Sequence, residues 1–145
     1  MKVFGVLSIV IFFILTSFTW ISSPKADEKP GIKFENITFK DALLKAKKEN
    51  KLIFMDAYTV WCGPCKFMER TTFRAEKVGE VFNANFINLQ VDMEKGEGLE
   101  IAKRYQIAAY PTLLVINGDG KVVKRMLGAM DEAELLKEIQ EVIKK

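Results

Sequence analysis

The fold of this 145-residue chain is decided by one short stretch, WCGPCK at residues 61–66, which contains both of its cysteines. Two cysteines at this spacing can close a small disulfide or supply half of a metal site. A structural zinc site is almost always four-coordinate, whereas this chain has no histidine and no third cysteine. Zinc bound within one subunit is therefore not expected.

The stretch follows a predicted buried strand at residues 51–58, because LIFM at 52–55 is continuously apolar, as in strands that are covered on both faces. A helix is expected to begin at the cysteines, so the Cys62 sulfur would face free amide groups at the positive end of the helix dipole. That environment favours the thiolate, which is the form that attacks a disulfide. We therefore predict that Cys62 is the nucleophile.

Cys65 lies one helical turn later, and we expect it to be more buried and to keep its proton until Cys62 has captured a substrate sulfur. It would then attack Cys62 as the resolving thiol and release the reduced substrate. Gly63 would let a substrate backbone approach closely, and Pro64 is compatible with a first helical turn. A purely structural disulfide is the alternative, but so small a loop removes little entropy from the unfolded chain.

The rest of the pattern alternates strands and helices. Helices are expected at about 38–49, from Cys62 onward with an interruption near 71–74, at 99–105 and from Asp131; strands are expected at 32–37, 86–93, 111–116 and 121–127. Thr38 and Asp41 approximate a capping signal, and NGDG at 117–120 is a strong hairpin signal. This order predicts an α/β fold with a central mixed sheet and helices on both faces.

The N-terminal region predicts export or anchoring. Residues 3–21 form a run of nineteen without a charged side chain, after Lys2; as a helix they would cover about 28 Å, close to the hydrocarbon thickness of a bilayer. We predict a signal peptide or membrane anchor at 1–23, a linker at 24–31 and one domain at 32–145. The positive charge before the run places that domain outside the cytoplasm, in the periplasm or on the extracytoplasmic face of the membrane.

The composition limits the partners. The formal net charge of +3 has no dense basic stripe behind it, so a nucleic-acid partner is not indicated. The sequence contains no nicotinamide, flavin or metal motif, so we expect no cofactor beyond a redox-active Cys62–Cys65 disulfide.

The chain resembles the thioredoxin superfamily over about residues 32–145, through WCGPCK after a buried strand and through AYPT at 109–112. The resemblance implies a thioredoxin-like fold. In that family the matching proline has a cis peptide bond and faces the cysteine pair, so Tyr110 and Pro111 resemble the substrate-docking element. Without the resemblance, Pro111 would be an ordinary strand-starting proline.

The resemblance also assigns a proton acceptor. Asp56, six residues before Cys62, matches the family's buried aspartate and would accept the proton of Cys65. The alternative is an aspartate exposed at a strand end. The lysine that accompanies this carboxylate in the family is replaced by Asn88, counting back from Asp92.

Two further positions match features of the family that border the substrate. Trp61 resembles the tryptophan that packs beside the active site, and Gly128 matches a glycine in the loop along the docking groove. A partly buried aromatic and a turn glycine are the respective alternatives. The insertion-like residues 94–98 and the helix before residue 52 resemble membrane-associated thiol reductants, including the outer domain of DsbD-type proteins.

The dipeptide between the cysteines indicates the direction of electron flow. Strong oxidants of this superfamily commonly carry histidine there, whereas Gly63 and Pro64 are the pair found in thioredoxin, whose potential is about 150 mV lower than that of DsbA. We therefore predict an enzyme that reduces protein disulfides and receives electrons from a transmembrane thiol donor. The alternatives are a membrane-tethered peptide-binding module with an incidental disulfide, and a net oxidase or isomerase.

Overall fold

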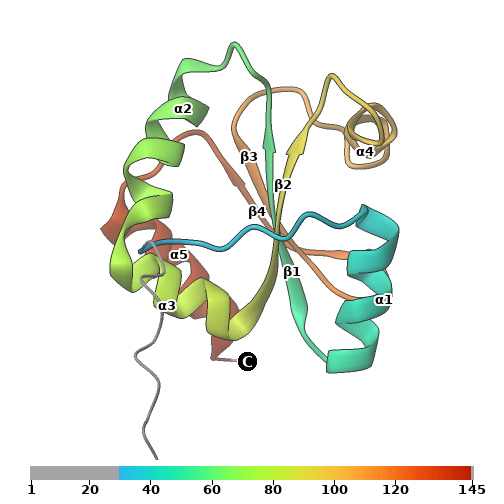
Figure 1. Cartoon of the computed structure of the whole chain (residues 1–145), viewed down its shortest axis with the longest axis horizontal. Coiled ribbons are helices and arrows are strands. Elements are labelled where there is room, and N and C mark those ends of the chain that lie inside the picture. The colour runs from blue at the N-terminus through green and yellow to red at the C-terminus, as the bar shows by residue number, and fades with distance from the viewer. Residues whose placement is uncertain (1–29, 145) are drawn as a thin grey trace, which may run out of the picture.

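The computed structural model describes residues 30–144, which are built around one mixed sheet (Figure 1). The strands lie in the order β2-β1-β3-β4. β1 pairs in parallel with β2, and the pairs β1 with β3 and β3 with β4 are antiparallel. The bounds of the strands are β1 Leu52–Tyr58, β2 Phe86–Asp92, β3 Thr112–Ile116 and β4 Val122–Leu127.

Helices cover both faces of this sheet, with α1 and α4 on one side and α2, α3 and α5 on the other (Figure 1). Side chains alternate along β1, so Ile53 and Met55 pack into the core under α1 and α4, whereas Phe54 packs into the core on the opposite face. The predicted α/β architecture is confirmed. The helical segments are α1 Phe39–Glu49, α2 Gly63–Arg70, the 3-10 turn η1 Thr72–Arg74, α3 Glu76–Asn85, α4 Gly98–Arg104 and α5 Glu132–Ile143.

Local sequence signals set the ends of several elements. Thr38 is the N-cap of α1, and its hydroxyl accepts a hydrogen bond from the Asp41 N–H at 3.1 Å. Asp131 caps α5 in the same way, with its carboxylate accepting from the Glu134 N–H at 2.9 Å. The predicted interruption near residues 71–74 is present as η1. The predicted hairpin at 117–120 joins β3 to β4.

The predicted edge strand at residues 32–37 is wrong. The segment passes along β2, where the Glu35 N–H donates to the Asn88 carbonyl at 2.8 Å, but residues 32–37 form no strand. Side chains bind the backbone groups that would pair in a β-ladder. The Lys33 N–H donates to Asn83 Oδ1, and the Lys33 carbonyl accepts from Asn88 Nδ2. Without repeated backbone pairing the segment is not a strand.

The predicted signal or anchor at residues 1–23 and most of the predicted linker lie outside the described residues. Within residues 30–144, no helix has the length and apolar character needed to span a membrane. At the end of the linker Gly31 is buried, and its carbonyl accepts a hydrogen bond from Asn83 Nδ2 at 3.0 Å.

Candidate active site

Cys62 is the N-cap residue of α2, directly after the turn that leaves β1. Its Sγ accepts a hydrogen bond from the Cys65 N–H at 3.1 Å, and its own N–H donates to the Thr59 carbonyl at 3.2 Å. Pro64 lies in the first turn of α2, where its missing N–H removes no helical hydrogen bond. The predicted helix start at the cysteines is confirmed.

Cys62 and Cys65 are joined by a disulfide, with an S–S distance of 2.03 Å and a Cα–Cα distance of 5.3 Å. The two residues are 3% and 4% exposed. The expectation that Cys65 is the more buried is therefore wrong for this oxidised form. The two sulfurs differ instead in their place on the helix, because the Cys62 sulfur is the one that accepts an N–H at the first turn.

The surface around the disulfide is open where a partner backbone would approach. Gly63 and Pro64 are exposed, and a methyl group built at Gly63 would meet no atom within 4 Å. Trp61, immediately before Cys62, is 63% exposed. Its ring meets that of Tyr110 edge-on, with the centroids 5.9 Å apart. This contact brings the two sequence motifs together.

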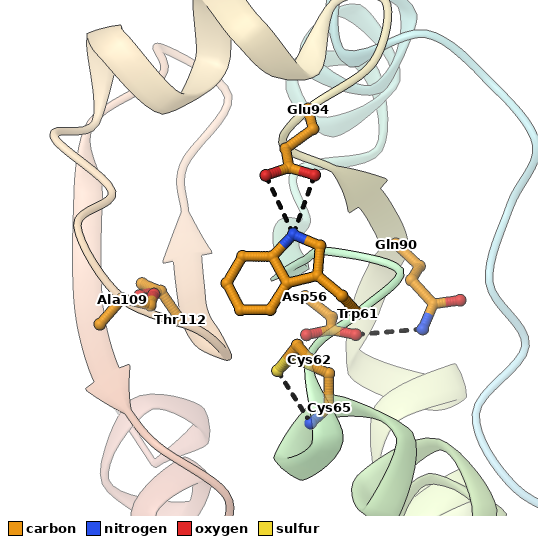
Figure 2. Close-up of a disulfide and its surroundings, with 8 residues drawn as sticks. All are labelled: Asp56, Trp61, Cys62, Cys65, Gln90, Glu94, Ala109 and Thr112. Atoms are coloured by element: carbon orange, nitrogen blue, oxygen red, sulfur yellow. Dashed lines mark hydrogen bonds between the residues drawn. A yellow bond between two sulfur atoms is a disulfide. The ribbon is translucent and has the colours of Figure 1, made fainter.

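The peptide bond between Tyr110 and Pro111 is cis, as the resemblance implied. Thr112 Oγ1 donates to the Ala109 carbonyl at 2.7 Å and closes the turn around this bond (Figure 2). The Pro111 carbonyl accepts a hydrogen bond from the Gly128 N–H at 2.9 Å. Gly128 has φ +89°, which a glycine adopts without strain. Pro111 and Gly128 therefore lie side by side.

Asp56 lies on β1 and is fully buried, which excludes the alternative of an exposed strand-end carboxylate. The pKa of Asp56 is raised to about 7: desolvation raises it most, the hydrogen bond from Gln90 lowers it in part, and the charge of Glu69 raises it. Gln90 Nε2 donates to Asp56 Oδ2 at 3.1 Å (Figure 2). The second carboxylate oxygen is buried without a hydrogen-bond partner among the described residues.

A pocket of about 300 Å³ lies beside the second cysteine. Cys65 and Gln90 both line it, so it extends from the second cysteine to the amide that holds Asp56. The hydroxyl of Thr59 is buried without a hydrogen-bond partner in the described part of the chain. The full lining is Tyr58, Thr59, Val60, Cys65, Lys66, Glu69 and Gln90.

The arrangement so far is a cysteine at the N-cap of a helix, a second cysteine one turn later, a buried carboxyl on the preceding strand, and a cis-proline that follows the tyrosine in contact with Trp61. A family model described as a thioredoxin-like domain matches residues 39–143. The chain belongs to the thioredoxin-like family.

Several thioredoxin-like proteins are similar to this chain. The thioredoxin of Mycobacterium tuberculosis is 29% identical over 119 residues, which cover 81% of this chain and 94% of that protein. The thiol:disulfide interchange protein DsbD of Pseudomonas fluorescens is 31% identical over 93 residues, covering 62% of this chain and 16% of that longer protein. The predicted likeness to DsbD-type proteins is confirmed.

A solved structure is similar over most of its length. It is the solution structure of a protein from Bacteroides thetaiotaomicron, named as a candidate disulphide-isomerase, with 49% identity and a TM-score of 0.69. The match covers 78% of this chain and 93% of that one. Together with the family match and the disulfide, these similarities make this protein a thiol:disulfide oxidoreductase of the thioredoxin type.

Thioredoxin-like proteins act on protein disulfides with a disulfide of their own and need no cofactor. In the described range 30–144, no group of three or more His, Cys, Asp and Glu side chains could hold a metal ion. The redox centre of this thioredoxin-like chain is the Cys62–Cys65 pair.

The residue that contacts the buried aspartate of this thioredoxin-like site is one that the sequence did not single out. Gln90, not Asn88, pairs with Asp56 in the parallel register of β1 and β2. Asn88 lies opposite Phe54, and its Nδ2 donates to Asn83 Oδ1 at 3.2 Å. Counting back from Asp92 could not find this contact, because side chains two residues apart on one strand share a face and only the register separates them.

The sequence also gave no sign of the contact between Trp61 and Glu94. Trp61 Nε1 donates to both carboxylate oxygens of Glu94, each at 3.0 Å (Figure 2). The segment 94–98 stood out only as an insertion. A hydrogen bond between residues so far apart in sequence has no local signal.

Proposed function

We propose that this thioredoxin-like protein reduces disulfides of partner proteins outside the cytoplasm, with Cys62 as the attacking thiol and Cys65 as the resolving thiol. One observation carries the assignment: the Cys65 N–H donates to Cys62 Sγ at 3.1 Å in the first turn of α2. This donor and the positive end of the helix both stabilise negative charge on that sulfur. Cys62 is therefore the better suited of the two to attack.

The reaction transfers two electrons from the protein to its partner. The Cys62 thiolate attacks one sulfur of the partner disulfide, which forms a mixed disulfide and releases the other sulfur as a thiolate that takes a proton. Cys65 then loses its proton and attacks Cys62 Sγ, which breaks the mixed disulfide and releases the second partner thiolate. The partner ends with two thiols, and the protein ends with the Cys62–Cys65 disulfide.

Asp56 is the proposed acceptor of the Cys65 proton. Its pKa of about 7 means that a large share of the carboxyl is ionised at neutral pH, while it still holds a proton strongly enough to accept one. The proposed route for this proton is water in the pocket that Cys65 and Gln90 both line, with Gln90 in contact with Asp56. The carboxyl acts on Cys65 rather than on the partner.

The partner chain is proposed to dock in extended form beside the disulfide. Tyr110 and the cis-bonded Pro111 provide its backbone contacts, and Gly128 borders the same groove. Gly63 leaves room above Cys62 for that chain, and Trp61 supplies an exposed apolar wall. These positions come from different segments, so the fold holds the groove ready before the partner arrives.

Reduction is the proposed direction because the dipeptide Gly63-Pro64 is the one found in thioredoxin. The potential of thioredoxin is about −270 mV and that of DsbA about −120 mV, and this difference corresponds to about 7 kcal/mol for a two-electron couple. The reduction potential of the Cys62–Cys65 couple, measured in the full chain against a glutathione buffer, tests the direction. We expect a value near −270 mV, and a value near −120 mV would reverse the assignment.

The location and the electron donor are proposed from the N-terminal run. An uncharged segment at residues 3–21 after Lys2 supports export or anchoring, with the domain on the outer side. A transmembrane thiol protein is the proposed donor, and the similarity to DsbD of Pseudomonas fluorescens supports it. Labelling of intact cells with a membrane-impermeant thiol reagent tests the location; a domain that reacts only after lysis would contradict it.

Variants of the two cysteines test the roles. Cys62→Ser should abolish the reduction of insulin disulfides, whereas Cys65→Ser should accumulate a mixed disulfide with the substrate. Unchanged turnover in Cys62→Ser would reject the mechanism. If both variants bind peptide as the unsubstituted protein does and none of the three turns over, the alternative of a binding module with an incidental disulfide is the better description.

Disulfide isomerisation is a second candidate, because the similar protein of Bacteroides thetaiotaomicron is named as a candidate disulphide-isomerase at 49% identity. Both activities begin with the same attack by Cys62. The two activities differ in the next step: in reduction Cys65 resolves the mixed disulfide, whereas in isomerisation the disulfides of the partner rearrange first. Reactivation of scrambled ribonuclease, with no net gain of partner thiols, would favour isomerisation.

A further inference from the structure

The exposed indole of Trp61 is held in place from two sides. Although Trp61 is 63% exposed, its Nε1 donates to both carboxylate oxygens of Glu94 at 3.0 Å. Figure 2 shows the Glu94 carboxylate aimed at the indole nitrogen. The Tyr110 ring meets the indole with its plane at 85° to it. Without these contacts, an aromatic side chain this exposed would sample several rotamers.

The turn that carries Glu94 is itself held by hydrogen bonds, which fix the position of the Glu94 backbone. The Glu94 N–H donates to Asp92 Oδ1 at 3.1 Å, and the buried Met93 donates its N–H to the last residue of β1 at 2.9 Å. At the other end of the turn, Glu97 accepts the Phe39 N–H with both carboxylate oxygens at 3.0 Å. The turn is therefore tied to the sheet and to α1.

Glu94 also places a negative charge beside Trp61, the residue before Cys62. The neighbouring Asp92 is paired with Lys95 at 3.3 Å, whereas across residues 30–144 Glu94 contacts the neutral indole and makes no ion pair with a lysine or arginine. A cationic side chain that lies on the exposed face of Trp61 would gain a cation–π contact and the attraction of this carboxylate together.

We propose that Glu94 is a positioning and specificity-determining residue, which fixes Trp61 beside Cys62 and favours partner segments that carry a lysine or arginine next to the reacting cysteine. This inference rests on the proposed exchange at Cys62 and adds the kind of partner that the site takes. Trp61 supplies the contact surface, and the Glu94 carboxylate supplies the charge selection.

Binding without exchange tests the preference separately from the proposed reaction. In the full chain with Trp20→Phe, Trp61 is the sole tryptophan, and its emission is followed on titration with two peptides in which serine replaces the cysteine. One peptide has arginine beside that serine and the other has glutamine. We expect the arginine peptide to bind about fivefold more tightly at low salt. Equal affinities would overturn the proposal.

Two variants of Glu94 separate charge from positioning. The amide oxygen of Glu94→Gln can still accept the indole N–H, so this variant should keep the fluorescence anisotropy of Trp61 and lose the preference for arginine. Glu94→Ala should lose the preference and also lower the anisotropy. A preference that persists in Glu94→Gln would overturn the charge role, and an unchanged anisotropy in Glu94→Ala would overturn the positioning role.

Glu100→Gln is the matched control, because Glu100 is an exposed carboxylate on α4 that pairs with Lys103 at 3.2 Å. It should leave both the preference and the anisotropy unchanged, and a loss of preference in this variant would overturn the assignment to Glu94. In a Cys65→Ser background, the two peptides with the cysteine restored and held as a mixed disulfide with glutathione report the exchange step, in which Cys62 attacks that disulfide and one thiol leaves. Failure of exchange with both peptides, while the binding preference remains, would count against the reductase and in favour of the docking role.

Discussion

Gln90 Nε2 donates a hydrogen bond to Asp56 Oδ2 at 3.1 Å across the parallel pair of β1 and β2. Desolvation raises the pKa of Asp56 to about 7, against the lowering effect of this hydrogen bond and with the support of the Glu69 charge. Three contributions of different sign thus act on one buried carboxyl. They place its titration in the pH range where the thiols exchange.

Replacement of Gln90 by leucine should shift the activity to higher pH. The amide N–H favours the ionised form of Asp56, so Gln90→Leu should raise the pKa of Asp56, by about one unit for the loss of one hydrogen bond. Less carboxylate is then available at neutral pH to accept the Cys65 proton. The pH profile of insulin reduction should move upward by a similar amount.

Asn88→Leu is the control for Gln90→Leu, since Asn88 is on the same face of β2 and contacts Lys33 and Asn83 rather than Asp56. It should lower the stability without moving the pH profile. Equal profiles in Gln90→Leu and the unsubstituted protein would show that the hydrogen bond does not tune the proton acceptor.

Replacement of Glu69 by glutamine should have the opposite effect on the pH profile. The negative charge of Glu69 raises the pKa of Asp56, so its removal lowers that pKa and the profile moves to lower pH. The shift should be smaller than for Gln90→Leu, because Glu69 is exposed and water screens its charge. Glu132→Gln, an exposed carboxylate on α5, should cause no shift; an equal shift in both variants would assign the effect to net charge.

Asp56→Asn should remove a pH dependence of the stability. The folded-state pKa of about 7 lies above the ordinary value of 3.8, so the native state keeps a proton that the unfolded chain releases. The contribution of this proton to the free energy of unfolding is fully present below the ordinary pKa. It is lost as the pH rises through the folded-state pKa. A difference of about three units corresponds to about 4 kcal/mol.

Urea unfolding of the oxidised protein between pH 4 and pH 8 measures this effect. The free energy of unfolding of Asp56→Asn, relative to the unsubstituted protein, should rise across this range by up to about 4 kcal/mol. A constant difference across the range would contradict burial as the cause of the raised pKa.

Gly128→Ala should lower the free energy of unfolding by about 1 to 2 kcal/mol, because φ +89° is a conformation that residues with a side chain rarely adopt. A methyl group at this position meets no atom within 4 Å, so the loss reports the backbone alone. Gly63→Ala is the matched control, since Gly63 has equal space and no positive φ. Equal losses in the two variants would contradict the backbone explanation.

Local signals predicted much of this fold. The continuous apolar run at residues 52–55 predicted β1, and Pro64, two residues after Cys62, marked the first turn of α2. Thr38 and Asp131 marked the starts of α1 and α5. Each of these signals is formed by residues close together in the chain.

The errors concern pairing between distant segments. The alternating segment at 32–37 was predicted as a strand, yet Asn83 and Asn88 take the hydrogen-bonding groups of Lys33. The contact of Gln90 with Asp56 was not foreseen, because the register of two parallel strands cannot be read from either strand alone.

The sequence by itself determined the cysteine pair, the helix that begins there and the alternation of strands and helices, since each follows from spacing and periodicity within a few residues. Tertiary structure decided which side chains meet the site: Gln90 on the buried carboxyl, Glu94 on the indole of Trp61, and Gly128 on the carbonyl of Pro111. These contacts join residues from separate strands and turns. Their geometry depends on strand register and on the packing of whole elements, which no local pattern of side chains specifies.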